Sequence, residues 1–212
     1  MIHFAQKDIL AMERLPRLKL INSITGYKPA NLIATINGKG QTNVAIISSV
    51  VHIGSDPALL GFFMRPMVTE RHTMENILET GVYTINHINS EIMEQAHFTS
   101  ADFERHESEF DKCHLTPVFK DDFLAPYVSE SNVQIGMELA EKVDIKLNNT
   151  ILVIGYVSHL YIEQDAFVID SGLDLKKADT VCISGLDTYH SVEKIASFPF
   201  ARTNNLPDFG NR

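Results

Sequence analysis

The sequence is poor in cysteine and has no long apolar run. Its 212 residues include two cysteines, Cys113 and Cys182, which lie far apart and form no CxxC motif. No apolar stretch approaches the roughly 20 residues that a membrane-spanning helix needs. Charged residues also interrupt the first 15 positions, where a signal peptide would carry its apolar core. We therefore expect a cytoplasmic protein without a membrane partner, whose thiols are packing residues.

The sequence also has no excess of basic residues. It carries 18 Lys and Arg against 27 Asp and Glu, which gives a formal net charge of -9. A nucleic-acid surface needs a basic face, so no nucleic-acid partner is expected. A small anionic ligand is compatible with this charge, because one local arginine can bind it. With 44% hydrophobic residues and no repeat or linker, residues 1–212 are expected to form a single domain.

Several catalytic signatures are missing. The chain contains no GxSxG, GxGxxG or GxxxxGK[ST] motif, which removes the usual serine-hydrolase, Rossmann and P-loop interpretations. None of its nine histidines has another histidine three or four residues away, and Phe110 stands where a second zinc ligand would follow His106 and Glu107. We expect no metal site and assign no catalytic side chain.

What the sequence does contain is a series of β-rich runs. The segment NLIATINGKGQTNVAIISSVV places two such runs around Asn37-Gly38-Lys39-Gly40, a strong hairpin signal because Asn and Gly accept positive φ. Further runs are ALLGFFM (58–64), VYTINHI (82–88), NVQIGMELAEKVDIKL (132–147), TILVIGYVSHLYI (150–162) and AFVID (166–170). Six or more strands with only short helices between them predict a closed antiparallel barrel rather than an alternating βαβ sheet.

Between His87 and Ser131 the strand pattern weakens. A loop-and-helix insertion of this length is unusual in a compact domain and is often functional. We expect it to form part of an active-site wall or a partner contact.

The segment RHTMENILETGVYTIN (71–86) predicts a helix, a stop and a strand. Thr73 is a good N-cap residue, Gly81 can end the helix, and a β-branched and aromatic run follows. The free N–H groups and positive dipole end of a helix start favour an anion, and Arg71 lies two residues before the expected cap. A phosphate would fit there. On this segment alone, the simpler interpretation is that Arg71 is a solvated surface arginine and Thr73 an ordinary cap.

The second strand of the hairpin carries small residues near its end. Ala45, Ser48 and Ser49 leave room for a flat ligand against the backbone and add hydrogen-bonding groups around it. The simpler interpretation is a strand end with two serines. Together with Arg71, Thr73 and Asn76, however, this strand end favours a ligand with a ring and a phosphate.

The ordered segments TNVAIISSV, GSDPALLGFFMRP, RHTMENILETGVYTIN, AHFTSADF, SEFD and SGLDTYH resemble the flavin reductase-like family of FMN-binding split barrels. The resemblance runs from about Leu15 to Ala201. It implies a mainly β fold, a six-stranded split β-barrel with short flanking helices and a loop/helix insertion. It also implies a homodimer with FMN held at the dimer interface.

The resemblance assigns site residues by position. Asn43, Ala45, Ser48 and Ser49 match the segment that lies against the flavin ring and ribityl chain in this family, and Val50 follows them. Arg71, Thr73 and Asn76 match the part that holds the FMN phosphate, with His72 where the family commonly has Asp. The stretch that contains His97, Thr99 and Ser100 matches one that flanks the cofactor. The candidate cofactor-binding set is Asn43, Ala45, Ser48, Ser49, Val50, Arg71, Thr73, Asn76, His97 and Ser100.

The function implied by the resemblance is NAD(P)H-dependent reduction of flavin, with electrons passing to a small-molecule acceptor. The flavin would do the redox chemistry, so no protein nucleophile is needed. Tyr189 and His190 would cap the pocket. Three alternatives are an FMN-binding electron carrier or redox sensor without turnover, an oxidase of a small amine such as pyridoxamine phosphate, and a structural dimer that binds no flavin.

Overall fold

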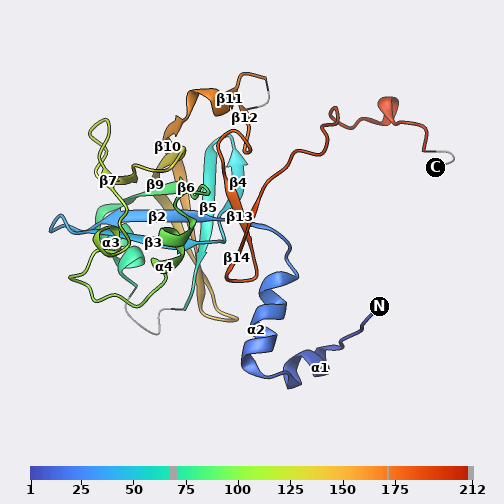
Figure 1. Cartoon of the computed structure of the whole chain (residues 1–212), viewed down its shortest axis with the longest axis horizontal. Coiled ribbons are helices and arrows are strands. Elements are labelled where there is room, and N and C mark those ends of the chain that lie inside the picture. Colours follow the sequence, from blue (N-terminus) through green and yellow to red (C-terminus); the bar gives the residue numbers. More distant parts are fainter. Residues whose placement is uncertain (67–70, 171, 210–212) are drawn as a thin grey trace.

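The computed structural model describes residues 1–66, 71–170 and 172–209 (Figure 1). Its main feature is an antiparallel sheet with the strand order β3-β2-β6-β9-β10-β5-β4. The strands are β2 (Asn31–Ile36), β3 (Thr42–Ile47), β4 (Val51–Ser55), β5 (Ala58–Met64), β6 (Val82–His87), β9 (Val133–Ile145) and β10 (Thr150–Ile162). All of the longer predicted runs are therefore strands of one sheet.

The sheet must curl, because its two outermost strands are neighbours in the chain. β3 and β4 lie at opposite ends of the strand order, yet only residues 48–50 separate them. So short a connection spans at most about 14 Å, so the two ends of the sheet lie close together. The Ser49 hydroxyl helps to join them: it donates to the Phe63 carbonyl at 3.0 Å and accepts from the Phe63 N–H at 3.1 Å. The predicted split β-barrel is confirmed, although its sheet has seven strands where six were expected.

The prediction was wrong about where one strand ends. The run TNVAIISSVV was expected to be a single strand, whereas the structure divides it at residues 48–50 into β3 and β4. The chain has to pass there from one end of the sheet to the other. AFVID is also no barrel strand, because only Phe167–Val168 (β11) is extended and it pairs with Gly172–Leu173 (β12) outside the barrel.

The predicted hairpin turn between β2 and β3 is confirmed. The Asn37 side-chain oxygen accepts the N–H groups of Lys39 and Gln41, each at 3.0 Å. Gly40 has a φ of 81°, which an L residue rarely adopts. Asn37 therefore sets the turn through its side-chain bonds, and Gly40 sets it through a left-handed backbone conformation.

Helices and short strands surround the barrel. The helix α3 (His72–Thr80) packs on β2 and β3, and the insertion supplies α4 (Met93–Phe98) and α5 (Glu109–Lys112). The remaining elements are α1 (Gln6–Ala11), α2 (Arg14–Ser23), β1 (Lys28–Pro29), β7 (Pro117–Val118), β8 (Tyr127–Val128), η1 (Gln164–Ala166), β13 (Val181–Ser184), β14 (Thr188–Ser191) and η2 (Thr203–Asn205). The insertion thus combines loop and helix, as expected.

The described residues form three apolar clusters. One contains Phe62, Tyr83 and Met137, a second lies between β2, β3 and the insertion and contains Phe110, and a small third contains Tyr127. Cys113 and Cys182 are both free thiols in buried positions of the fold. None of the helices in the described residues is long and apolar enough to cross a membrane.

The two terminal segments extend away from the barrel on the same side of the view in Figure 1. Neither α1 nor α2, both fully described, contains a buried residue. Large apolar side chains are exposed on both segments: Ile2, Phe4, Leu10, Leu15, Leu18, Ile21, Ile24 and Tyr27 on the first, and Ile195, Phe198, Phe200, Leu206 and Phe209 on the second. We call residues 1–27 the N-terminal arm and residues 192–209 the C-terminal arm.

Candidate functional site

Strand β3 is where the candidate residues meet. It carries Asn43 and Ala45 and leads directly into residues 48–50. The helices α3, α4 and α5 all contact this strand. The structure therefore brings the hairpin strand, the segment that begins at Arg71 and the insertion to one place, although they lie far apart in the sequence.

The start of α3 differs from the prediction. The helix begins at His72 with Arg71 as its N-cap, so Thr73 lies inside the first turn and does not cap it. The reason is a competing partner, because the Thr73 hydroxyl is hydrogen-bonded to the Asn43 side chain at 3.0 Å. The predicted stop is confirmed: Gly81 has a φ of 75°, and its N–H donates to the Ile77 carbonyl at 2.9 Å.

Buried amides hold α3 against the sheet. With the Asn43 oxygen facing Thr73, the Asn43 amide group donates to the Glu109 carboxylate at 3.2 Å, which satisfies both ends of the side chain. On the next turn of α3, the Asn76 amide donates to the Thr35 hydroxyl at 3.0 Å. Asn43, Thr73 and Asn76 are all buried. These three candidate residues therefore fix the start of the helix against the sheet through buried hydrogen bonds.

Glu109 is a member of this network that sequence reasoning missed. Its carboxylate is buried beside β3 and accepts the Val44 N–H at 3.2 Å. Burial raises the pKa of this carboxyl group above its usual range. The only signal in the sequence was the SEFD segment of the family resemblance, which contains Glu109 without indicating where its side chain lies.

Arg71 provides a test of whether the site fits a phosphate. Its Nε atom is buried and has no hydrogen-bond partner among the described residues. Leaving a buried charged donor unpaired is costly, so this group needs an acceptor from outside the described chain. An anion at the start of the nine-residue helix α3 would supply one, and the helix dipole would favour it as well. The residues present therefore fit a phosphate-bearing ligand.

The segment 48–50 is partly buried and lies at the junction of β3 and β4. The Ser49 side chain is committed to the Phe63 backbone, so it is the backbone of this residue that remains for a ligand. Val50 packs against the barrel core. Ala45 and Ser48 are partly buried and small, which agrees with the expected space for a flat ring.

The end of α4 brings His97 next to Tyr189. The His97 Nδ1 atom and the Tyr189 hydroxyl are 3.1 Å apart, and the two rings meet edge to face. Burial raises the pKa of Tyr189 to about 12, so its hydroxyl stays protonated at neutral pH. The Ser100 hydroxyl donates to the His97 carbonyl at 2.7 Å, and Thr99 accepts the N–H of Ile46 on β3 at 2.9 Å. The GLDTYH segment thus lies beside the candidate residues of the insertion.

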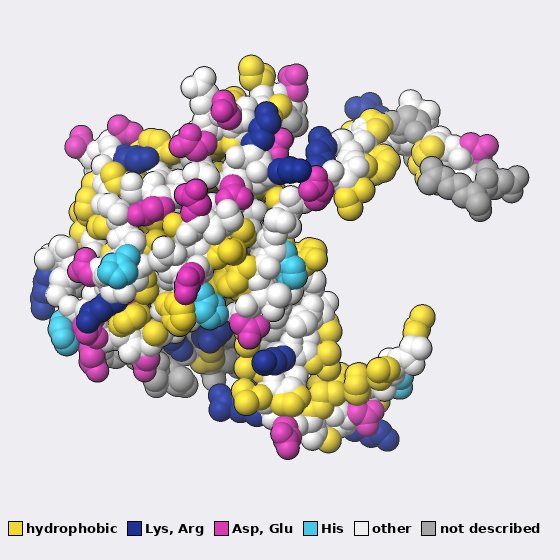
Figure 2. Space-filling view, in the orientation of Figure 1, with side chains coloured by type: hydrophobic (Ala, Val, Ile, Leu, Met, Phe, Trp, Pro, Cys, Tyr) yellow, Lys and Arg dark blue, Asp and Glu magenta, His cyan; other side chains and the backbone are white. Residues whose placement is uncertain are grey.

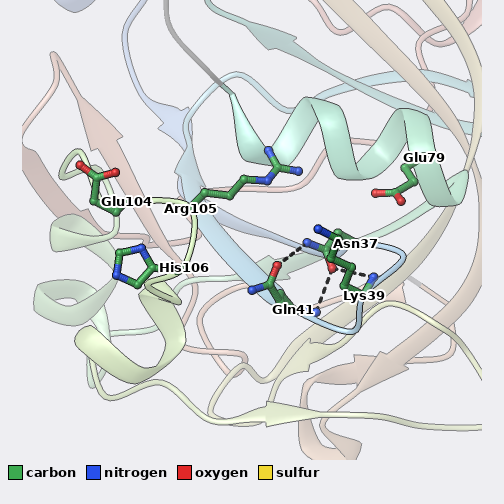
Figure 3. A pocket seen from close by; sticks show the side chains of 7 residues that line it. All are labelled: Asn37, Lys39, Gln41, Glu79, Glu104, Arg105 and His106. Carbon is green, nitrogen blue, oxygen red and sulfur yellow. Dashed lines mark hydrogen bonds between the residues drawn. The ribbon is translucent and has the colours of Figure 1, made fainter.

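Two cavities are present near the insertion, and neither is lined by a candidate cofactor residue. One, of about 360 Å³, lies between the β2–β3 turn, α3 and the insertion. Figure 3 shows Arg105 reaching toward α3, and the Asn37 amide donating to Gln41 at 2.9 Å. Arg105 is paired with Glu75, and the lining of this cavity is mostly polar or charged. A flavin ring needs flatter, more apolar walls.

The described residues contain no group of three or more His, Cys, Asp or Glu side chains placed to hold a metal ion.

Three comparisons relate this chain to known proteins. A crystal structure from Shewanella frigidimarina NCIMB 400, described as a candidate flavin reductase with a split barrel domain, is 45% identical, with a TM-score of 0.92 over 95% of this chain and 100% of the other. Nitrilotriacetate monooxygenase component B from Bacillus cereus is 17% identical, with a TM-score of 0.81 over 93% of this chain and 98% of the other, and shows the same fold. An uncharacterised protein of Aquifex aeolicus (strain VF5) is 26% identical over 129 residues, which are 60% of this chain and 66% of that protein.

The family assignment comes from a domain model rather than from any single relative. The model described as the flavin reductase like domain matches residues 27–171, which include β1 through β11 with all the candidate site residues. The chain belongs to the flavin reductase-like family.

Proposed function

We propose that this protein binds FMN and reduces it with NAD(P)H, passing the electrons to a small-molecule acceptor. The observation that supports FMN is the buried Nε atom of Arg71 at the start of α3, which has no partner among the described residues, in a chain of the flavin reductase-like family. Riboflavin, which has no phosphate, would offer this atom no acceptor. We also propose that residues 1–212 form one domain and that the free, buried thiols suit the cytoplasm.

Different residues would bind different parts of the cofactor. Arg71 and the N–H groups of the first turn of α3 would bind the phosphate, while Asn43, Thr73 and Asn76 fix that turn to β2 and β3. The 48–50 segment would lie along the ring, with His97 and Tyr189 bordering it. When bound, FMN would supply the redox chemistry, and the protein would supply binding, orientation and exclusion of water.

A homodimer is part of this proposal. Ala45, Ser48 and Ser49 are only partly buried, so part of the surface along which the ring would lie is open to solvent in one chain. Pairing about a two-fold axis is the commonest way for identical chains to associate, and a second chain would wall this surface.

Replacing Arg71 with alanine should weaken FMN binding by about tenfold or more and leave riboflavin binding nearly unchanged. The reason is that a charge-assisted hydrogen bond contributes roughly 1.5–3 kcal/mol, and only FMN has a phosphate to make it. Titration by quenching of flavin fluorescence measures both affinities. Lys146→Ala, which removes an exposed cation at the β9–β10 turn, is the control and should change neither. Equal losses for both flavins would contradict the phosphate assignment.

Turnover separates the proposed reductase from an electron carrier. NAD(P)H added without oxygen to the FMN-loaded protein should bleach the flavin absorbance, and an added acceptor should restore it over many cycles. A carrier or redox sensor would bind FMN but would not oxidise NAD(P)H in the steady state. Steady-state NAD(P)H oxidation with excess free flavin as acceptor decides between them.

A further inference from the structure

The N-terminal arm lacks the contacts that stabilise a short helix. α2 has ten residues, and α1 has six. Isolated helices of this length are marginal in water, and most helical stability in proteins comes from packing an apolar face. Leu15, Leu18 and Ile21 are spaced by three residues, which places them within an arc of about 120° on α2. All three are exposed, with Leu15 at 67% and Leu18 and Ile21 at 41% each, so a large part of this apolar face is open to solvent.

The C-terminal arm also exposes large apolar side chains. Ile195, Phe198 and Leu206 are exposed, and Phe198 reaches 88%. Figure 2 shows the two arms bordering an open concave space beside the barrel, with apolar side chains along both. A large apolar side chain removes roughly 60–120 Å² from water when buried, so the exposed apolar residues of both arms offer about 1,000 Å². One partner of a stable interface contributes about 800 Å².

We propose that both arms dock on a second copy of this chain, so that each chain of a homodimer embraces the other. This inference rests on the proposed homodimer but not on FMN or NAD(P)H. It adds a dimer contact on the arms to the one proposed beside the candidate cofactor residues. The apolar side chains Val51 and Ile53 of β4 are exposed on the barrel and would receive part of the partner's arms.

Charge favours a second copy over an unrelated partner. Residues 1–24 contain four basic side chains, Lys7, Arg14, Arg17 and Lys19, and two acidic ones, Asp8 and Glu13. This segment therefore carries a formal charge of +2. The rest of the chain carries -11, and the two together give the net charge of -9. A basic arm on an acidic body is complementary to another copy of the same body, and attraction between them would offset the repulsion of two acidic chains.

The test uses the full chain in three forms. Wild type should scatter light as a species of about twice the 23.8 kDa chain mass. The variant Leu15→Glu/Leu18→Glu/Ile21→Glu should raise the dimer dissociation constant at least about 100-fold, because each chain loses three apolar contacts. Its far-UV circular dichroism should still show the barrel, since no residue of α2 is buried. Leu147→Glu, at the β9–β10 turn where the side chain is even more exposed, should remain dimeric.

A second variant guards against misfolding of the first. Phe198→Glu/Leu206→Glu changes only the C-terminal arm and should also weaken the dimer. A monomeric wild type, or a dimer that both arm variants leave intact, would overturn the proposal. So would a monomeric wild type that sediments with anionic phospholipid vesicles, because the arms would then serve a membrane surface. A wild-type dimer that binds no FMN would disprove the proposed cofactor and leave this inference standing.

Discussion

Gly155→Ala is expected to destabilise the protein by about 3 kcal/mol, at the upper end of what overpacking a core costs. Gly155 lies on β10 inside the barrel, and a Cβ atom there would be 2.5 Å from the Tyr83 hydroxyl oxygen and 2.9 Å from the Glu138 carbonyl oxygen. Tyr83 is fully buried, and Glu138 contributes backbone of a neighbouring strand, so neither can move aside without disturbing the sheet. Urea denaturation followed by circular dichroism measures the loss.

Two further variants show whether these contacts are the cause. Gly38→Ala makes the same chemical change, but its new Cβ would meet only the end of the flexible, exposed Glu79 side chain, so its stability should change little. The Tyr83 hydroxyl is buried without a partner among the described residues, so Tyr83→Phe alone should be nearly neutral. Combined with Gly155→Ala, it should recover about half of the loss, since the Glu138 contact remains. An undiminished loss in the double variant would show that Tyr83 is not involved.

Acidification is expected to remove about 3 kcal/mol of stability through His87. Burial at the end of β6 lowers the pKa of this side chain from 6.5 to about 4, so the folded protein favours the neutral ring. The unfolded chain binds the proton more readily. The contribution of His87 is therefore fully present above pH 6.5 and is lost as the pH falls from 6.5 toward 4, at about 1.4 kcal/mol per pKa unit.

Comparison of variants isolates this contribution from those of other groups. His87→Gln should show a loss of stability between pH 7 and pH 4 that is smaller by about 3 kcal/mol than that of wild type. His3→Gln makes the same change at an exposed terminal position and should keep the wild-type loss. The measurement is the free energy of unfolding in urea at both pH values. Parallel curves for wild type and His87→Gln would contradict the role of His87.

The strands were predictable because their signals are local. The β2–β3 hairpin follows from Asn37 and Gly40, and the boundary between α3 and β6 follows from Gly81. The long runs of β9 and β10 carry enough β-branched residues to be recognised without any tertiary information. The division at residues 48–50 was missed because Ile47, Val50 and Val51 continue the apolar run, and only the closure of the sheet requires a break there.

The positions of the candidate residues were predictable, but their partners were not. A sequence places Thr73 near a helix start, yet it cannot show that Asn43, 30 residues earlier, competes for its hydroxyl. In the same way, Ser49 is small and carries a hydroxyl group, which suggested contact with a ligand, but its side chain binds the Phe63 backbone instead. Both contacts join different structural elements, and residue type and spacing do not show which side chains of two such elements will meet.

The sequence predicts least about the insertion and the arms. Glu109 looks like one of several acidic residues in its segment, and only the fold buries it beside Val44. The apolar residues of the arms could equally have belonged to the core, so their exposure became evident only once the barrel core was seen to be complete without them.

The order of strands in the sheet has a consequence for how the chain reaches its folded state. Three of its neighbouring pairs, β2–β3, β4–β5 and β9–β10, are hairpins of consecutive strands. Such pairs close short loops and form within microseconds. The other three pairs join strands that are distant in sequence; β5 and β10, for example, meet across some 90 residues. Folding is therefore expected to begin with three independent hairpins, and its rate is expected to be set by the search that brings them into one ring.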